Sequence, residues 1–180
     1  MIQRLAIALV LVSPLGVADD ASTITSVKPI IMEFGQALKS ELKAAISAGG
    51  PLAGIAVCNA QAGGITEASS KLGWEVSRTS LKWRNESNSP TQWEAQQLES
   101  FEAKLKSGVN PQKLWAVYED EKEIRVMKAI MTDKVCLACH GENLNEEVSQ
   151  TLKEFYPNDR ATGFKAGQLR GAFSLKKIKL

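Results

Sequence analysis

The sequence predicts an α+β protein in which helices flank an antiparallel sheet. Helical and strand-like patterns follow one another as helix, strand, strand, helix, hairpin, short helix, helix and strand. A doubly wound parallel sheet would instead show a repeated strand–helix–strand rhythm. Two strand-like runs, at residues 114–119 and 123–131, are separated only by a short acidic stretch, which indicates an antiparallel hairpin.

Length and composition are those of one compact domain. The chain has 180 residues, of which 44% are hydrophobic and 23% are charged, and its formal net charge is +2. A chain of this size buries a core without support from disulfides or oligomerisation. The near balance of acids and bases argues against intrinsic disorder and against nucleic acid as a partner.

Residues 1–18 have the features of a secretory signal peptide. Arg4 supplies a positive start, residues 5–12 form a short apolar core, and Ala18 ends a small-residue cleavage site. We predict cleavage after Ala18, which leaves residues 19–180 as a single domain. No later apolar run in the sequence approaches membrane-spanning length. The predicted location is the bacterial periplasm or an equivalent exported space.

An amphipathic helix is predicted for residues 22–48. Its apolar side chains recur at helical spacing, and Gly49, Gly50 and Pro51 stop the pattern. The helix is expected to serve packing alone. Its apolar positions are Val27, Ile31, Phe34, Leu38, Leu42 and Ile46.

An extended segment comes next. Trp74 and Val76 share one face with Arg78, whereas Leu81 and Trp83 share the opposite face. The buried phase therefore switches between the two sets, which predicts a bulge or bend. With Trp74 and Val76 inside, Arg78 also points inward, where a guanidinium needs an anionic partner. The alternative is a surface arginine or an ordinary arginine–glutamate pair.

Ser89 is predicted to cap the next helix. Pro90 would take the first helical position, and Gln92 stands where a capping box needs it. Gly108 ends this helix. The side chains expected on its buried face are Leu98, Phe101 and Leu105.

Two further elements are predicted after the hairpin and the short helix that follows it. Asn145 is predicted to cap a short helix that ends before Pro157. Residues 169–180 then alternate as a final strand.

The pentapeptide from Cys136 to His140 is the strongest chemical signal in the sequence. In C-x-x-C-H, the two thiols bind the vinyl groups of haem and the histidine lies beneath the iron. We therefore predict one covalently bound haem c, attached through Cys136 and Cys139, with His140 as the proximal iron ligand. A thioredoxin-like redox pair and a zinc site are the alternatives, but their sequence context is missing.

His140 is the only histidine in the chain, so bis-histidine ligation within one chain is ruled out. The opposite iron position is empty, holds water, or is taken by a lysine, a methionine such as Met127 or Met131, or Cys58. A ferric haem would sequester the odd thiol of Cys58, which is otherwise a liability in an oxidising space. Thiolate ligation predicts a low midpoint potential. The alternative role of Cys58 is that of a small buried hydrophobic residue.

Several sequence blocks together resemble the single-haem c-type domain family first described in cyanobacteria. They span most of the chain after the signal peptide. The blocks are residues 55–58 (IAVC), 76–85 (VSRTSLKWRN), 90–94 (PTQWE), 136–141 (CLACHG), 156–159 (YPND) and 167–172 (GQLRGA).

This resemblance implies a PAS-like fold that holds the haem on one side of the sheet, with Cys58 as the distal iron ligand opposite His140. Arg84 and Arg170 lie in the matching blocks and join Arg78 as candidates to contact the haem propionates or the pocket. The family's domain also occurs as the sensor of some bacterial histidine kinases. No kinase or receptor module follows in this sequence, so we expect a stand-alone protein that acts through a redox or signalling partner.

The expected function is one-electron redox chemistry or redox sensing at low potential. The alternative is a haem-based sensor in which NO or CO displaces Cys58 and a partner protein receives the signal. A peroxidase would need an open distal position and an acid–base group beside it, while the one histidine is assigned to the iron. An enzyme is therefore not expected.

Overall fold

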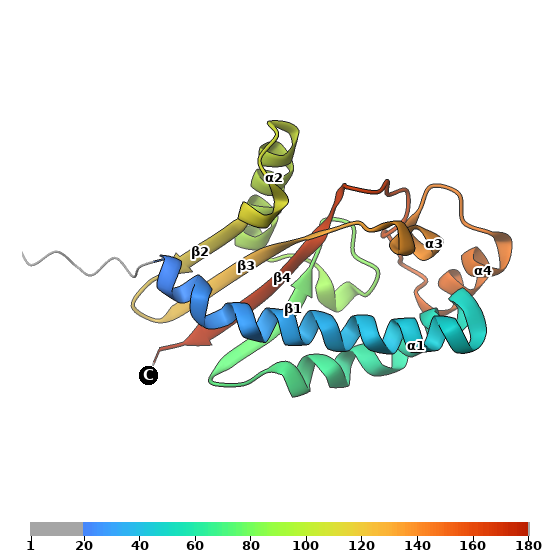
Figure 1. Ribbon diagram of the computed structural model, residues 1–180, viewed down its shortest axis with the longest axis horizontal. Coiled ribbons are helices and arrows are strands. Elements are labelled where there is room, and N and C mark those ends of the chain that lie inside the picture. The colour runs from blue at the N-terminus through green and yellow to red at the C-terminus, as the bar shows by residue number, and fades with distance from the viewer. Residues whose placement is uncertain (1–19, 180) are drawn as a thin grey trace, which may run out of the picture.

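The computed structural model describes residues 20–179, so the predicted signal peptide lies outside the described residues. A four-stranded antiparallel sheet forms the centre, with strand order β1-β4-β3-β2. Helices flank this sheet (Figure 1). The predicted α+β, PAS-like fold is confirmed. The strands are β1 (Trp74–Thr79), β2 (Trp115–Glu119), β3 (Glu123–Met131) and β4 (Leu169–Ile178).

Helix α1 (Asp20–Ser69) is two antiparallel helices joined by a sharp turn (Figure 1). Gly49 and Gly50 leave the helical region, and Gly50 has φ 69°, a conformation that favours glycine. The predicted first helix and its glycine stop are confirmed. The segment after Pro51, for which the sequence patterns predicted no helix, is the second half of the hairpin and carries Cys58. None of the helices within residues 20–179 is long and apolar enough to span a membrane.

The first half of α1 packs on one face of the sheet. Phe34 is fully buried there, and its ring meets the edge of the Phe173 ring at 5.6 Å between centroids. Burying such apolar side chains supplies most of the stabilisation of this layer. The buried residues of this core are Val27, Ile30, Ile31, Phe34, Trp74, Val76, Val126 and Leu175.

Helix α2 (Gln92–Lys106) buries Leu98 and Phe101 in a second core. Its start corrects the sequence prediction, because the N-cap is Thr91 and not Ser89. Thr91 and Glu94 form a reciprocal capping box, in which Glu94 accepts the Thr91 backbone N–H at 2.8 Å. Ser89 precedes a proline and is extended, so it ends the preceding 3₁₀ turn. The other buried residues of this core are Leu114, Met127, Ala129, Leu169 and Ala172.

The predicted change of buried face after β1 is confirmed. Trp74 and Val76 lie in the core beneath α1, whereas Leu81 packs against the core beneath α2. Strand β1 ends at Thr79, and the chain then leaves the sheet. This departure carries residues 80–84 toward the far end of the molecule.

Two short helices close that end of the molecule (Figure 1). Helix α3 (Leu137–His140) follows a 3₁₀ turn at Lys134–Cys136, and α4 (Glu146–Phe155) follows α3. Asn145 caps α4 as predicted, accepting the Val148 N–H at 2.7 Å. Val148 and Leu152 of α4 pack with Ile55 of α1 in a third, smaller core.

Gly171 in β4 is expected to tolerate no side chain. Its φ is 156°, and a Cβ there would lie 2.3 Å from the Thr79 carbonyl oxygen. We expect Gly171→Ala to lower the free energy of unfolding by about 3 kcal/mol, because backbone atoms must shift to relieve the clash. Chemical denaturation measures this loss. Gly167→Ala is the matched control, since Gly167 has φ 82° but open space around it, and it should lose only about 1 kcal/mol. Equal losses in both variants would contradict the steric explanation.

Candidate functional site

The residues of the C-x-x-C-H motif lie together at one end of the sheet, on α3 and the 3₁₀ turn before it. The chain enters this turn from the end of β3. Because Cys136, Cys139 and His140 fall within little more than one helical turn, their side chains share a small volume. Gly141 ends α3, and a Cβ at that position would lie 2.6 Å from the Leu137 carbonyl oxygen. The tight end of α3 therefore requires a glycine.

The His140 imidazole is oriented by the protein backbone. Its Nδ1 lies 2.6 Å from the Ala161 carbonyl oxygen. Because a carbonyl only accepts, Nδ1 carries the proton and donates it, which leaves Nε2 as the atom able to bind a metal. Burial, followed by the charges of Arg170 and Arg84, lowers the pKa of His140 well below its usual value. The ring is thus held neutral, as a metal ligand must be.

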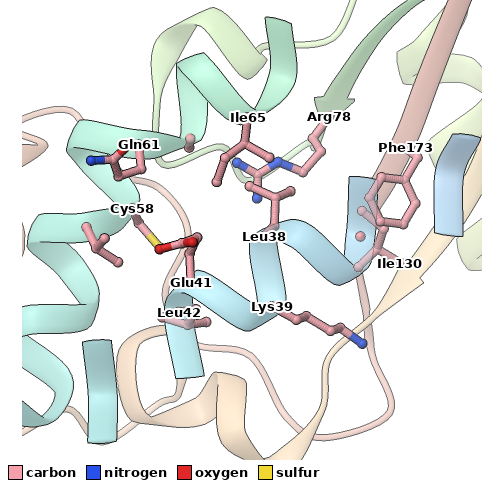
Figure 2. A pocket seen from close by; sticks show the side chains of 13 residues that line it. Leu38, Lys39, Glu41, Leu42, Cys58, Gln61, Ile65, Arg78, Ile130 and Phe173 are labelled. Carbon is pink, nitrogen blue, oxygen red and sulfur yellow. The ribbon is translucent and has the colours of Figure 1, made fainter. Parts of the chain in front are cut away.

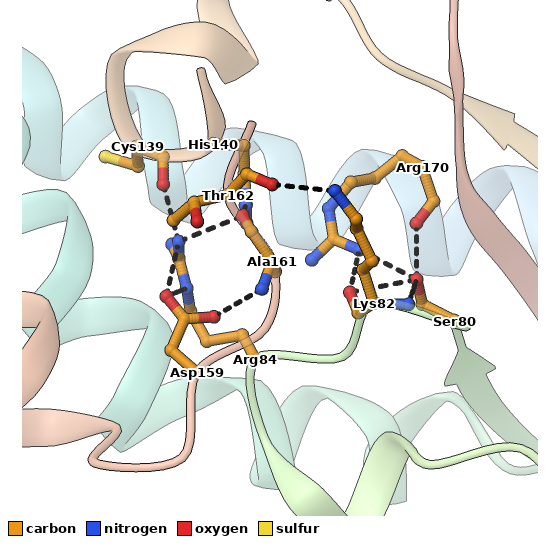
Figure 3. A network of polar contacts seen from close by, with 9 residues as sticks. All are labelled: Ser80, Lys82, Arg84, Cys139, His140, Asp159, Ala161, Thr162 and Arg170. Carbon is orange, nitrogen blue, oxygen red and sulfur yellow. Dashed lines mark hydrogen bonds and ion pairs between the residues drawn. The ribbon is translucent and has the colours of Figure 1, made fainter. Parts of the chain in front are cut away.

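A charged pair fastens this histidine segment to a neighbouring loop (Figure 3). Arg84 binds Asp159 through Nε at 3.1 Å and through Nη2 at 3.0 Å. The same Nη2 donates to the Cys139 carbonyl at 2.5 Å and to the Ala161 carbonyl at 3.4 Å. Asp159 in turn accepts the Ala161 backbone N–H at 2.7 Å. Arg84 therefore contacts the carbonyl oxygen of Ala161, which accepts the hydrogen bond from His140, and Asp159 contacts the N–H of the same residue.

Backbone hydrogen bonds hold the same loop alongside α3. Phe164 N–H donates to the His140 carbonyl and Gly163 N–H donates to the Gly141 carbonyl, both at 2.9 Å. The Phe164 ring also meets the His140 ring edge to face at 6.3 Å. These contacts fix the position and the orientation of the His140 imidazole as well as its hydrogen bond.

Arg170 also lies next to the Phe164 ring. Its guanidinium stands 5.2 Å from the ring centroid and donates to Ser80 Oγ and to the Lys82 carbonyl, each at 3.1 Å. Burial, then repulsion from Arg84 and Arg78, lowers the pKa of Arg170 to about 10. Arg170 remains a cation at neutral pH, in a region that already holds other cations.

A cavity of about 140 Å³ lies between the two halves of α1 and the sheet (Figure 2). Cys58 reaches it from the second half of α1, and its side chain is exposed at the surface. Partial burial nevertheless raises the pKa of the Cys58 thiol, while Arg78 and Arg84 oppose that rise. Cys139 also interacts electrostatically with Cys58, so the motif and this thiol are near each other. Other residues that line the cavity include Leu38, Ile65, Ile130 and Phe173.

Arg78 lines the same cavity, as its alternation with Trp74 and Val76 predicted. Figure 2 shows its guanidinium turned toward Leu38 and Ile65. Burial lowers the pKa of Arg78, opposed by Cys58 and Tyr156. Within residues 20–179, no carboxylate forms an ion pair with this guanidinium. Its predicted anionic partner is therefore not an ion-paired carboxylate of the described residues, although the Glu41 side chain lines the same cavity.

Comparison with known proteins places this arrangement in a family. The sequence profile of Tll0287-like proteins matches residues 18–177, nearly the whole described chain. The chain belongs to the Tll0287-like family. This confirms the family resemblance predicted from the sequence blocks. A search of curated proteins finds no match.

The Tll0287-like fold is also seen in a solved structure. The crystal structure of the cyanobacterial haem protein Tll0287 matches this chain with a TM-score of 0.64 and 24% sequence identity. The match covers 90% of this chain and 98% of that one. The two proteins therefore share their fold over almost their whole length.

Charge is unevenly distributed at this end of the Tll0287-like domain. Arg78, Arg84 and Arg170 all lower the pKa of His140, whereas Asp159 forms an ion pair with Arg84. Lys82 adds a further cation, because its Nζ donates to the Thr162 carbonyl at 3.2 Å and lies 5.2 Å from the Phe164 ring, so positive charge exceeds negative charge at this end of the molecule. An anionic group would be attracted to this region.

Sequence reasoning assigned no role to Asp159 or Ala161 of this Tll0287-like chain. Asp159 lies in a block quoted for the family resemblance, but an acidic residue in a polar loop gives no sign of its partner. Ala161 acts through its backbone, so its side-chain type carries no signal. The methionines named as alternative iron ligands, Met127 and Met131, pack in the core beneath α2, away from the Cys58 cavity.

Proposed function

We propose that this chain is an exported haem protein that performs one-electron redox chemistry or redox sensing. Cys136 and Cys139 would attach one haem covalently, and His140 Nε2 would bind its iron. The observation that carries the proposal is the His140 imidazole, neutral and held by Nδ1 on the Ala161 carbonyl, directly beside two thiols at C-x-x-C spacing. When bound, the haem supplies an Fe(III)/Fe(II) couple.

The surrounding charges fit such a group. A haem carries two anionic propionates, and the excess of positive charge beside His140 would attract them. Arg78 is the best placed to bind a propionate, because its guanidinium lines the cavity without a carboxylate partner among the described residues. Arg84 and Arg170 already donate to protein acceptors, so they would act mainly through their charge. The haem protein Tll0287, which has the same fold, supports this proposal.

Cys58 is proposed as the ligand on the opposite side of the iron. It reaches the cavity from a rigid helix and lies near Cys139. A thiolate there favours Fe(III) and lowers the midpoint potential. Such a protein would exchange electrons with a partner protein or would report its oxidation state to one.

Spectroelectrochemical titration of the purified, haem-loaded protein tests the redox function. We expect a single reversible transition with the one-electron slope of about 59 mV per decade. Its midpoint should lie below that of histidine–methionine cytochromes c, because thiolate donation stabilises the ferric state. A strongly positive midpoint would contradict the low-potential proposal.

A second candidate function is the sensing of a diatomic gas. It is favoured by the exposed position of Cys58, which gives a small ligand a path from solvent to the iron when the thiol leaves. Adding CO or NO to the ferrous protein should then shift the Soret band. An unchanged band at saturating gas would exclude gas sensing and leave the redox proposal standing.

A further inference from the structure

We propose that Arg84 and Asp159 form a positioning pair that sets how strongly His140 donates electrons to the iron, with the two charges acting in opposite directions. This inference rests on the proposed binding of haem iron by His140. It goes further by assigning the adjustment of the potential to two residues that touch neither the iron nor the cavity thiol.

The pair converges on the hydrogen-bond acceptor of the imidazole. Arg84 Nη2 and His140 Nδ1 both donate to the Ala161 carbonyl oxygen, at 3.4 Å and 2.6 Å. Asp159 accepts a hydrogen bond from the Arg84 guanidinium through Oδ2 and one from the Ala161 N–H through Oδ1. Figure 3 shows these contacts as one continuous network. A change in either charged side chain must therefore alter the acceptor that His140 uses.

Both charges are shielded from water. The side chains of Arg84 and Asp159 are only 13% and 9% exposed. Electrostatic interactions weaken much less in such surroundings than at an open surface. Arg84 also ranks among the charges that lower the pKa of His140, so its field reaches the imidazole.

The direction of each effect follows from elementary electrostatics. A strong hydrogen bond from Nδ1 makes the imidazole more basic toward a metal, which favours Fe(III). Arg84 competes for the Ala161 carbonyl and places a positive charge beside the ring, so it favours Fe(II) and raises the potential. Asp159 opposes this with its negative charge. Removing the cation should lower the midpoint potential, and removing the anion should raise it.

A purely structural role would give a different pattern. If the pair merely held the loop against α3, losing either member would loosen the same contacts, and the two variants would shift the potential in the same direction. Opposite shifts in the midpoint potential therefore distinguish an effect on the His140 imidazole from a role in holding the loop in place.

The test is redox titration of haem-loaded Arg84→Gln and Asp159→Asn proteins beside the wild type. Glutamine keeps a donor for the Cys139 carbonyl, and asparagine keeps an acceptor for the Ala161 N–H. We expect the Fe(II)/Fe(III) ratio at a fixed potential to fall at least about threefold in Arg84→Gln and to rise by a similar factor in Asp159→Asn, each a shift of about 28 mV. Arg84→Lys, which keeps the charge, should stay closer to the wild type than Arg84→Gln.

Arg160→Gln is the matched control. Arg160 follows Asp159 directly, but its guanidinium is stacked 4.8 Å from the Trp83 ring, whereas the side chains that donate to the Ala161 carbonyl are those of Arg84 and His140. The same loss of charge should therefore leave the midpoint close to the wild-type value. A shift as large as that of Arg84→Gln would overturn the inference, because it would show a general charge effect.

The remaining outcomes are also decisive. Shifts of the same sign in Arg84→Gln and Asp159→Asn, or no shift in either, would overturn the inference. If Arg84→Gln fails to load haem, the sign of the Asp159→Asn shift decides, since only an upward shift supports the inference. A wild-type protein that carries no haem would instead refute the proposed function, and the haem content of the wild type is measured first.

Discussion

Replacing both Cys136 and Cys139 by serine is expected to abolish covalent haem attachment completely. Each thiol supplies one thioether bond to a vinyl group, and a serine hydroxyl cannot replace it. The protein is produced with a cytochrome c maturation system, then denatured, run on a gel and stained for haem. Intact mass spectrometry measures the same result, because only the wild type should carry the additional mass of one haem.

Cys58→Ala is the control for this experiment. It removes the third thiol of the chain but leaves the C-x-x-C-H motif unchanged, so it should keep the haem through denaturation. A wild-type chain without bound haem after expression with the maturation system would contradict covalent attachment. Haem retained by the double serine variant would contradict the assigned attachment residues.

Cys58→Ala is also expected to change the iron site itself, with the second largest effect. Removing a thiolate ligand destabilises Fe(III), so the midpoint potential should rise. The open position should then accept exogenous ligands, because the methyl group of alanine cannot bind the iron. EPR of the ferric protein should change from a thiolate-ligated low-spin spectrum to a high-spin or water-ligated one. The redox titration and CO binding provide two further readouts.

Gln61→Ala provides the matched control, because Gln61 lines the same cavity from the same half of α1. Its spectrum and midpoint should remain those of the wild type. If Cys58→Ala leaves the wild-type EPR spectrum and midpoint unchanged, Cys58 is not an iron ligand. If the variant fails to attach haem at all, Cys58 serves folding or haem attachment, and its proposed place on the iron is wrong.

The sequence predicted most helices and strands because apolar spacing and helix capping depend on residues close together in the chain. The alternation of apolar side chains placed β3 and β4, and Asn145 marked the start of α4 through its own hydrogen bond. The start of α2 was placed two residues early, since Ser89 and Thr91 both have capping side chains. The carboxylate of Glu94 decides in favour of Thr91. The second half of α1 was missed because its glycines disfavour a helix and its small side chains give little apolar periodicity.

The sequence alone indicated the family and the fold class, and it predicts the chemistry of the site. Those features depend on covalent spacing and on residue types, as in the C-x-x-C-H motif, the single histidine and the odd Cys58. Only the tertiary structure decided which donors and acceptors meet. The Ala161 carbonyl meets His140, Arg84 meets Asp159, and Arg78 faces a cavity without a carboxylate partner among the described residues. The physical reason is that these contacts join segments far apart in the chain. Every residue also has the same backbone carbonyl, so the sequence does not indicate which carbonyl accepts a hydrogen bond.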